Sequence, residues 1–418
     1  MKRPLAVWFA ALLGAVSQVP QARAHDGERT VSRGYGADGD LDDPRGIELT
    51  LGVRELYDDN LYRLPESLDS QASRDDYIRR ISAGLGGNWQ WSRQKVLLNL
   101  LATNSAYERN DQLDNTSGRG RAEWEWRAGN ALSGALGGDF SRTLVSFSNT
   151  RFFGKDLLDS SGVFASLGFR LGPSWSFKAA GRSASTEHSA NERRFDNFRT
   201  DSVTAGLHFK TSSESEIGVD VRRTEGDFDR AVNLSGQLFD RDYVDESASL
   251  ELNQILSPRT RVGLKLGYLS REYGDVALAD VGKGGFSGAI GDVLLQWQAS
   301  NKIMLNFNGW RRLRAYLDAE SDYFVSEGAS VAPTWQPSDR ISVELELGFE
   351  TQDYLGASAN LQSSARADRV RSGKLQLSYS PLRKLHFDLI GSIEERESDR
   401  DLLEYESQIA SFGVRWTY

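Results

Sequence analysis

The last eight residues of this chain show its commonest pattern, a strict alternation of apolar and polar side chains. Because strand side chains have a period of two, such a segment has one apolar and one polar face. Gly413 lies on the polar face, and the other face is formed by Phe412, Val414, Trp416 and Tyr418. The pattern is typical of the closing strand of an outer-membrane barrel, which the barrel-assembly machinery receives during biogenesis. The alternative is an edge strand of a soluble sandwich.

Four internal segments alternate in the same way, at residues 119–127, 217–222, 261–268 and 341–350. In each of them the polar face carries several charged residues. A lipid-exposed barrel needs apolar residues only at alternate positions, so its average composition stays polar. We therefore interpret the apolar face as lipid-facing and the charged face as lumen-facing.

Short turn signals built from Gly, Pro, Asn, Asp and Ser recur at intervals of roughly 40 residues, the length of one hairpin plus one long loop. They lie at residues 91–93, 128–130, 172–174, 212–214, 257–259, 300–302, 337–339 and 381–383. Longer polar segments lie between them, at residues 58–76, 146–156, 187–197, 225–242 and 358–368. Alternating short and long connections are typical of short periplasmic turns and long external loops.

These signals predict an all-β, transmembrane, antiparallel up-and-down β-barrel over residues 46–418. Eight short turns bound nine hairpins and hence eighteen strands, with sixteen strands as the alternative. An even count places both termini in the periplasm, and a barrel of this size leaves room for an aqueous channel.

Tryptophans gather near strand ends beside the short turns or the C-terminus, and they fall on the apolar face. Indole rings at one level of a barrel indicate a membrane-interface girdle, and core anchors are the alternative. The predicted girdle consists of Trp89, Trp91, Trp124, Trp126, Trp175, Trp297, Trp335, Trp416 and Tyr418.

The N-terminus predicts a secretory signal peptide over residues 1–24, because Lys2 and Arg3 precede a short apolar stretch and a small-x-small cleavage site before His25. An N-terminal anchor helix is the alternative. Residues 25–45 are expected to form a flexible periplasmic segment. After the signal no apolar run approaches the roughly 18 residues that a membrane-spanning helix needs.

Composition narrows the function classes. The formal net charge of -9 argues against nucleic-acid binding, which needs a basic surface. The chain has no cysteine, which excludes disulfides and thiolate metal sites and is compatible with export through an oxidising periplasm.

Two short runs carry a family resemblance. Residues 57–65, Tyr-Asp-Asp-Asn-Leu-Tyr-Arg-Leu-Pro, and residues 332–336, Ala-Pro-Thr-Trp-Gln, resemble the EpsL-type outer-membrane proteins of exopolysaccharide biosynthesis, grouped with the putative beta-barrel porins. The first run has a second aspartate where a small polar residue is common, and the chain ends on Tyr418 rather than phenylalanine. The resemblance covers the layout of the whole mature chain. It implies a barrel that carries an exopolysaccharide across the outer membrane with periplasmic polysaccharide-export components as partners, and it supplies no functional residues.

A pore for sugar polymers needs polar groups that replace water around the chain. The candidate lumen residues are Arg121, Arg127, Arg170, Lys178, Arg222, Lys265, Arg312, Arg314, Glu123, Glu125, Asp220, Glu344 and Glu346. The basic members would suit an anionic polymer through charge-assisted hydrogen bonds, and rings of charge set pore selectivity. The alternative is a lumen whose charges pair with one another. Residues 304–314, with Arg311, Arg312 and Arg314, are the predicted constriction.

No catalytic or metal-binding pattern is present. His25 begins the mature chain, His188 is expected in a loop, and His208 and His386 fall on polar strand faces, without metal-ligand spacing. We therefore expect neither catalysis nor a cofactor, with a barrel hydrolase as a minor alternative. The acidic residues 227–242 could bind calcium or bridge lipopolysaccharide phosphates, although a solvated loop is the simpler interpretation.

Three functions remain open: exopolysaccharide export, a diffusion porin for small solutes, and a plugged barrel that anchors a synthesis complex. In all three, outer-membrane lipid and lipopolysaccharide would surround the chain.

Overall fold

The computed structural model describes residues 46–68, 74–148, 150, 152–211, 215–229, 232–234, 237–239, 242–273, 285–318, 321–355 and 366–418. The predicted signal peptide and N-terminal segment, residues 1–45, lie outside the described residues, as do the turn at 212–214 and most of 358–368.

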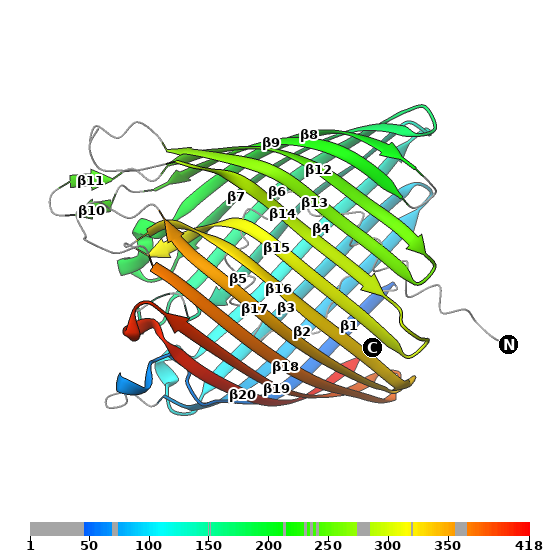
Figure 1. Cartoon of the computed structure of the whole chain (residues 1–418). Coiled ribbons are helices and arrows are strands. Elements are labelled where there is room, and N and C mark those ends of the chain that lie inside the picture. The colour runs from blue at the N-terminus through cyan, green and yellow to red at the C-terminus, as the bar shows by residue number, and fades with distance from the viewer. Residues whose placement is uncertain are drawn as a thin grey trace.

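The chain forms a closed antiparallel barrel of eighteen strands, which confirms the predicted fold and the larger strand count (Figure 1). The wall consists of β1 (Ile47–Asp58), β2 (Asp76–Trp91), β3 (Gln94–Tyr107), β4 (Asn115–Ala128), β5 (Leu132–Leu144), β6 (Leu157–Leu171), β7 (Trp175–His188), β8 (Phe198–Lys210), β9 (Glu216–Phe228), β12 (Tyr243–Ser257), β13 (Thr260–Tyr273), β14 (Phe286–Trp297), β15 (Ile303–Asp318), β16 (Ser321–Ser338), β17 (Ile341–Leu355), β18 (Arg366–Leu382), β19 (Leu385–Ser398) and β20 (Tyr405–Thr417). Closure comes from β1 and β20, which pair from Thr50↔Thr417 to Asp58↔Ile409.

Short elements occupy the long connections. β10 (Val232–Leu234) and β11 (Gln237–Phe239) form a hairpin between β9 and β12. Short 3-10 helices lie at η1 (Glu66–Leu68), η2 (Asp111–Leu113), η3 (Asn191–Asp196) and η4 (Asp401–Leu403). Within the described ranges, no helix has the length and apolar character needed to cross a membrane.

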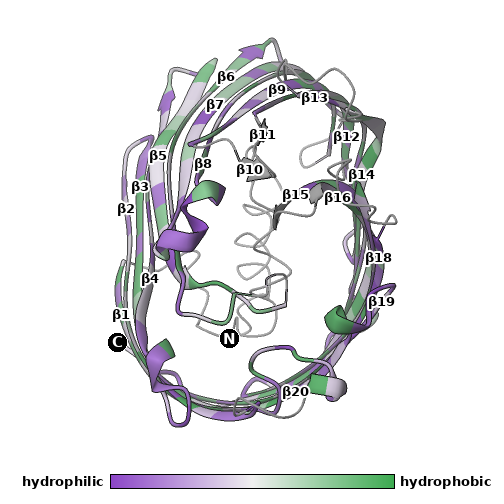
Figure 2. Cartoon of the chain, turned by 90° about the vertical axis from the view of Figure 1, so that its left-hand side faces the viewer, coloured by the Kyte–Doolittle hydropathy of each residue, from purple (hydrophilic) through white to green (hydrophobic). Residues whose placement is uncertain are grey.

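The two faces of the wall differ as the alternation predicts. On β8, Val203 is 65% exposed, whereas its neighbour Thr204 is 6% exposed. The outward residues present an apolar surface, and the inward residues are polar and contact one another across strands. Viewed along its axis, the barrel is a ring with connections folded over and into its opening (Figure 2).

The short turns and the long connections lie at opposite ends of the barrel (Figure 1). Two turns use a left-handed residue that favours glycine, Gly129 at φ 62° and Gly172 at φ 83°. All eight tryptophans of the predicted girdle have the outward strand parity near the short-turn end. Five of the eight are at least 42% exposed: Trp91, Trp124, Trp175, Trp297 and Trp335. Their role at a membrane interface stays a prediction.

A ring of outward ion pairs lies toward the other end of the wall, and we call it the arginine collar. Each pair joins two residues that face each other on neighbouring strands. Four of the pairs have distances of 2.5–3.2 Å: Arg79–Glu55, Arg142–Asp159, Arg223–Glu246 and Arg371–Glu395. The fifth pair is Arg311–Glu327. Opposite charges directly across two strands stabilise the pairing between them.

Candidate functional site in the barrel lumen

Ion pairs between neighbouring strands dominate the inner face. Lys265 on β13 pairs with Glu251 on β12 at 2.6 Å, and the Nε atom of Arg312 on β15 lies 2.6 Å from Asp292 on β14. Arg121 pairs within β4 with Glu123 at 2.5 Å. At least four of the eight predicted basic lumen residues, Arg121, Lys178, Lys265 and Arg312, thus have a carboxylate partner. These pairs favour the interpretation of a mutually paired lumen.

One inward pair spans a strand that lies between its members. Arg182 on β7 donates two hydrogen bonds to Asp139 on β5, at 2.6 and 2.8 Å. Gly162 on β6 lies beneath the guanidinium, and a Cβ there would come within 2.5 Å of the Arg182 Nη2 atom. Neither Arg182 nor Asp139 was selected from the sequence, because a contact across an intervening strand has no local signal.

His208 is the centre of a second cross-strand cluster. Its Nδ1 atom lies 2.9 Å from Glu216, and its Nε2 atom lies 3.1 Å from Asp220. Lys178 on β7 also pairs with Glu216, at 2.5 Å. The imidazole lies against Gly218, where a Cβ would come within 2.2 Å of Nδ1. The cluster therefore joins β7, β8 and β9 as a structural unit at the inner wall.

The other predicted lumen residues are distributed along the inner face rather than gathered at one site. Arg222 donates to Thr224 at 3.2 Å, and Arg314 is 5% exposed. Glu344 and Glu346 occupy successive inward positions on β17, two residues apart. Among the described residues, neither has an ion-pair partner within 4 Å. Three further residues have the inward parity near the short turns: Glu125, Arg127 and Arg170.

The connection between β5 and β6 folds into the barrel, and we call its described part, residues 145–148, 150 and 152–156, the lumen loop. Phe147 and Ser148 are less than 10% exposed. The Phe147 ring lies 4.8 Å from the ring of Tyr62, and Arg396 on β19 donates to the Ser148 carbonyl. The lumen loop therefore extends from the β5–β6 side to the β19 side of the barrel.

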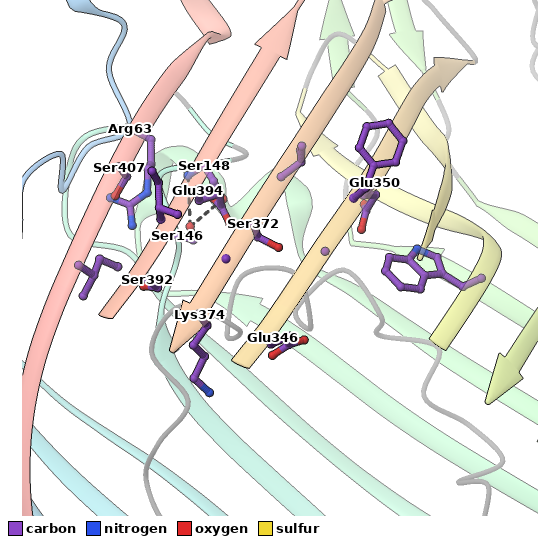
Figure 3. Close-up of a pocket in the computed structure, with 17 residues that line it drawn as sticks. Arg63, Ser146, Ser148, Glu346, Glu350, Ser372, Lys374, Ser392, Glu394 and Ser407 are labelled. Carbon is purple, nitrogen blue, oxygen red and sulfur yellow. Dashed lines mark hydrogen bonds between the residues drawn. The ribbon is translucent and has the colours of Figure 1, made fainter. Parts of the chain in front are cut away.

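A pocket lies between the lumen loop and the wall from β15 to β20 (Figure 3). Its polar lining combines hydroxyls, carboxylates and two cations. The lining residues with such groups are Arg63, Ser146, Ser148, Glu346, Glu350, Ser372, Lys374, Ser392, Glu394 and Ser407. Trp310 also lines the pocket, and its indole donates to Ser326 at 3.0 Å. This pocket is the candidate functional site.

The run at residues 57–65 builds the support of this pocket. Asp58 has no exposed surface and accepts from two groups within the run, Arg63 at 3.0 Å and the Asn60 backbone at 3.0 Å. The Asn60 amide donates to the carbonyls of Leu64 and Glu406. Arg63 adopts a left-handed φ of 54°, which is held by these contacts. We call this arrangement the Asp58 clasp, and it fixes the first long connection against β20.

A family model described as putative beta-barrel porin 2 matches residues 167–418, more than half of the chain. The chain belongs to this porin family. The narrower EpsL-type resemblance stays a prediction. No curated protein matches this porin.

Solved structures similar to this porin include three proteins of Pseudomonas aeruginosa. OccK2 (OpdF), solved in complex with glucuronate, is 9% identical with a TM-score of 0.50, over 89% of this chain and 100% of that one. OccK9 (OpdG) is 11% identical with a TM-score of 0.48, over 90% and 100%. The outer membrane protein opdK is 11% identical with a TM-score of 0.47, over 89% and 99%. At 9% identity, the likeness to OccK2 shows the barrel fold alone.

Two sequence expectations for this porin need correction. Arg311 does not join Arg312 and Arg314 on the inner face. Its strand parity is outward, and it donates to the Ala289 carbonyl at 2.8 Å. His188 is not in a loop but ends β7, where its buried Nδ1 atom lies 2.6 Å from Asp156.

Of the acidic segment 227–242, the structure describes residues 227–229, 232–234, 237–239 and 242. Within the ranges that the structure describes, no group of three or more potential ligands could hold a metal ion.

Sequence reasoning missed most of the pocket. Ser146 and Ser148 belong to a long loop whose path depends on distant contacts. Trp310 has the inward parity of β15, in contrast to the eight girdle tryptophans, and this parity was the one signal that could have separated it from them.

Proposed function

We propose that this porin is a non-catalytic outer-membrane channel for small, uncharged or cationic polyhydroxylated solutes of the saccharide class. The observation that carries the proposal is the hydroxyl- and carboxylate-lined pocket beside the lumen loop. Serine hydroxyls both donate and accept, and carboxylates accept from solute hydroxyls, so together they can replace the water around a sugar. Convergent polar groups in a concave site are typical of small-molecule recognition.

The charges of the pocket support this choice of solute. Glu346, Glu350 and Glu394 oppose only Lys374 and Arg63, and Arg63 is already neutralised by Asp58. An anionic solute would meet an excess of carboxylates, whereas a neutral sugar would not. Rings of acidic residues favour cations in channels.

Export of an exopolysaccharide is the second candidate. It is favoured by the basic residues along the inner face of β6 to β9, namely Arg170, Lys178, Arg182 and Arg222, which could follow an anionic chain from the short-turn end. In this case periplasmic polysaccharide-export components would deliver the polymer, and the lumen loop would have to leave its position. A third outcome, a plugged barrel that anchors a synthesis complex, predicts no conductance.

The test is single-channel recording of the refolded full chain in planar bilayers, with maltotriose or an acidic polysaccharide added on either side. Our proposal expects a cation-preferring channel that maltotriose blocks transiently, with longer open times in Glu346→Gln. Glu125→Gln, at the inner face far from the pocket, is the matched control. Block by the acidic polymer alone would favour export, and a silent barrel would favour the anchor.

A further inference from the structure

The pairing between β14 and β15 covers only part of the length of these two strands. These strands share seven register pairs, from Gly291↔Arg311 to Trp297↔Leu305, whereas β13 and β14 share twelve. Above this level β14 continues to Phe286 and β15 continues to Asp318, and no pairing joins them among the described residues. Arg311 donates to the Ala289 carbonyl, so a side chain here replaces a strand as hydrogen-bond partner.

The described parts of β15 and β16 next to their connection bend into the ring of the barrel at this point (Figure 2). Tyr323, Val325 and Leu313 have outward parity on their strands, yet they pack against inward residues of the neighbouring wall. Their partners there include Phe286, whose ring lies 6.0 Å from that of Tyr323. The hairpin thus overlaps the inner face of β13 and β14 instead of continuing the wall.

A buried cation holds the overlap. Arg271 on β13 pairs with Asp245 at 2.7 Å and is 5% exposed. Its guanidinium lies 3.8 Å from the Tyr243 ring centroid and 6.0 Å from that of Tyr323 on the hairpin. Cation–π contacts are stronger when the arginine is desolvated, as it is here. Arg271 therefore links the fixed wall to the inward hairpin.

The same sequence also fits a completed wall. If the register of β14 and β15 continued, Ile290 would pair with Arg312 and Ala289 with Leu313. Leu313, Tyr323 and Val325 would then face outward, as the alternation of their strands requires, and the unpaired edge of β14 would be satisfied. Unpaired strand edges are costly wherever they meet lipid.

We propose that the upper ends of β15 and β16, residues 312–318 and 321–325, form a movable panel of the wall that narrows the lumen when tucked inward and widens it when paired with β14. The tucked arrangement buries the aromatic cluster and the paired arrangement completes the hydrogen bonds, so the two oppose each other. The consequence for flux rests on the proposed channel function, whereas the position of the panel does not.

Two cysteine pairs report the panel position directly, because the chain has no native cysteine. Gly288→Cys with Arg314→Cys would face each other in the paired arrangement, because this pair lies three positions beyond Gly291↔Arg311, where the present pairing of β14 and β15 ends. A disulfide needs Cβ atoms about 3.5–4.5 Å apart. Leu269→Cys with Val325→Cys report the tucked arrangement. Both are oxidised in the refolded full chain. We expect both pairs to cross-link, with higher single-channel conductance for the first than for the second, and reversal of both effects by reductant.

Cross-linking of the 269/325 pair alone, even after prolonged oxidation, would overturn the proposal and show a fixed panel. Cross-linking of both pairs with equal conductance would also overturn it. A barrel that cross-links at both pairs but never conducts would instead contradict the proposed channel function.

A second measurement does not depend on new cysteines. Arg271→Ala should raise the fraction of time in the wide conductance state, because the panel loses its cationic contact. Lys265→Ala is the matched control, since it also leaves one inward carboxylate of β12 unpaired but does not contact the panel. Equal effects of the two variants would contradict the role of Arg271.

Discussion

Tyr62 and Phe147 join two connections that are far apart in the sequence, with their ring centroids 4.8 Å apart. Tyr62 follows β1, and Phe147 lies in the lumen loop between β5 and β6. The Tyr62 hydroxyl also donates to Asn110 in the connection after β3, at 2.9 Å. One residue of the 57–65 run thus helps to hold the lumen loop, and with it one side of the candidate pocket.

Replacing Tyr62 by alanine should release the lumen loop. Loss of a buried aromatic side chain costs about 3–5 kcal/mol, and here the cost falls on the contact between two connections. We expect larger and noisier single-channel currents, with a β-strand content by circular dichroism that does not change. Tyr77→Ala is the control, because the Tyr77 ring packs against the Tyr57 ring at a centroid distance of 4.9 Å but lies on the outer face. Unchanged currents in Tyr62→Ala would show that the loop has other anchors.

The ionisation of Tyr62 should give the channel an alkaline transition. Burial raises the pKa of the Tyr62 phenol above its ordinary value of 10.0. The neutral phenol is the form that the folded state stabilises, so this contribution is complete below pH 10 and is lost as the pH rises through the folded-state pKa. We expect current noise to increase only above about pH 10 and this increase to be absent in Tyr62→Phe. An identical alkaline transition in Tyr62→Phe would assign it to another tyrosine.

The Asp58 clasp should contribute strongly to stability. Asp58→Ala leaves the buried Arg63 guanidinium without its carboxylate, and breaking a buried pair costs about 3–5 kcal/mol. The measurement is the urea midpoint of unfolding in detergent or lipid. The readout is gel mobility, because a folded barrel and its heat-unfolded form migrate differently. Glu55→Ala, which breaks the exposed collar pair with Arg79, should leave the midpoint unchanged. Equal midpoints for the two variants would contradict a special role for the clasp.

Gly162 should be essential for the ion pair that crosses over β6. A Cβ at this position would meet the Arg182 guanidinium at 2.5 Å, so Gly162→Val should displace it from Asp139. We expect a shift of the reversal potential in a salt gradient, because one inward cation changes its position. Gly391→Val is the control, since a Cβ there has nothing within 4 Å. A reversal potential that does not move would mean that this pair lies away from the ion path.

The strand count and the faces of the wall could be predicted from the sequence, whereas the contents of the lumen could not. Turn residues and a period of two are local signals, and they located the short turns and the outward tryptophans. The partners of Arg182, His208 and Arg271 depend on register between strands and on glycines that allow close approach. The lumen loop and the tucked hairpin depend on contacts between distant segments, such as Tyr62 with Phe147, for which no local pattern exists.

The arginine collar and the tryptophans near the short turns together set the height of the apolar band on the outer wall. On β16, Trp335 and Glu327 are eight positions apart, which corresponds to about 19 Å along the barrel axis at a strand rise of about 3.3 Å and a tilt near 45°. On β2, the ten positions from Trp89 to Arg79 correspond to about 23 Å by the same reasoning. Both values are below the roughly 30 Å hydrocarbon core of a typical bilayer. Ion pairs cannot enter hydrocarbon cheaply, so a thick membrane would have to thin around this protein. The chain is thereby matched to a thin bilayer, and lipid thickness alone would disfavour its residence elsewhere.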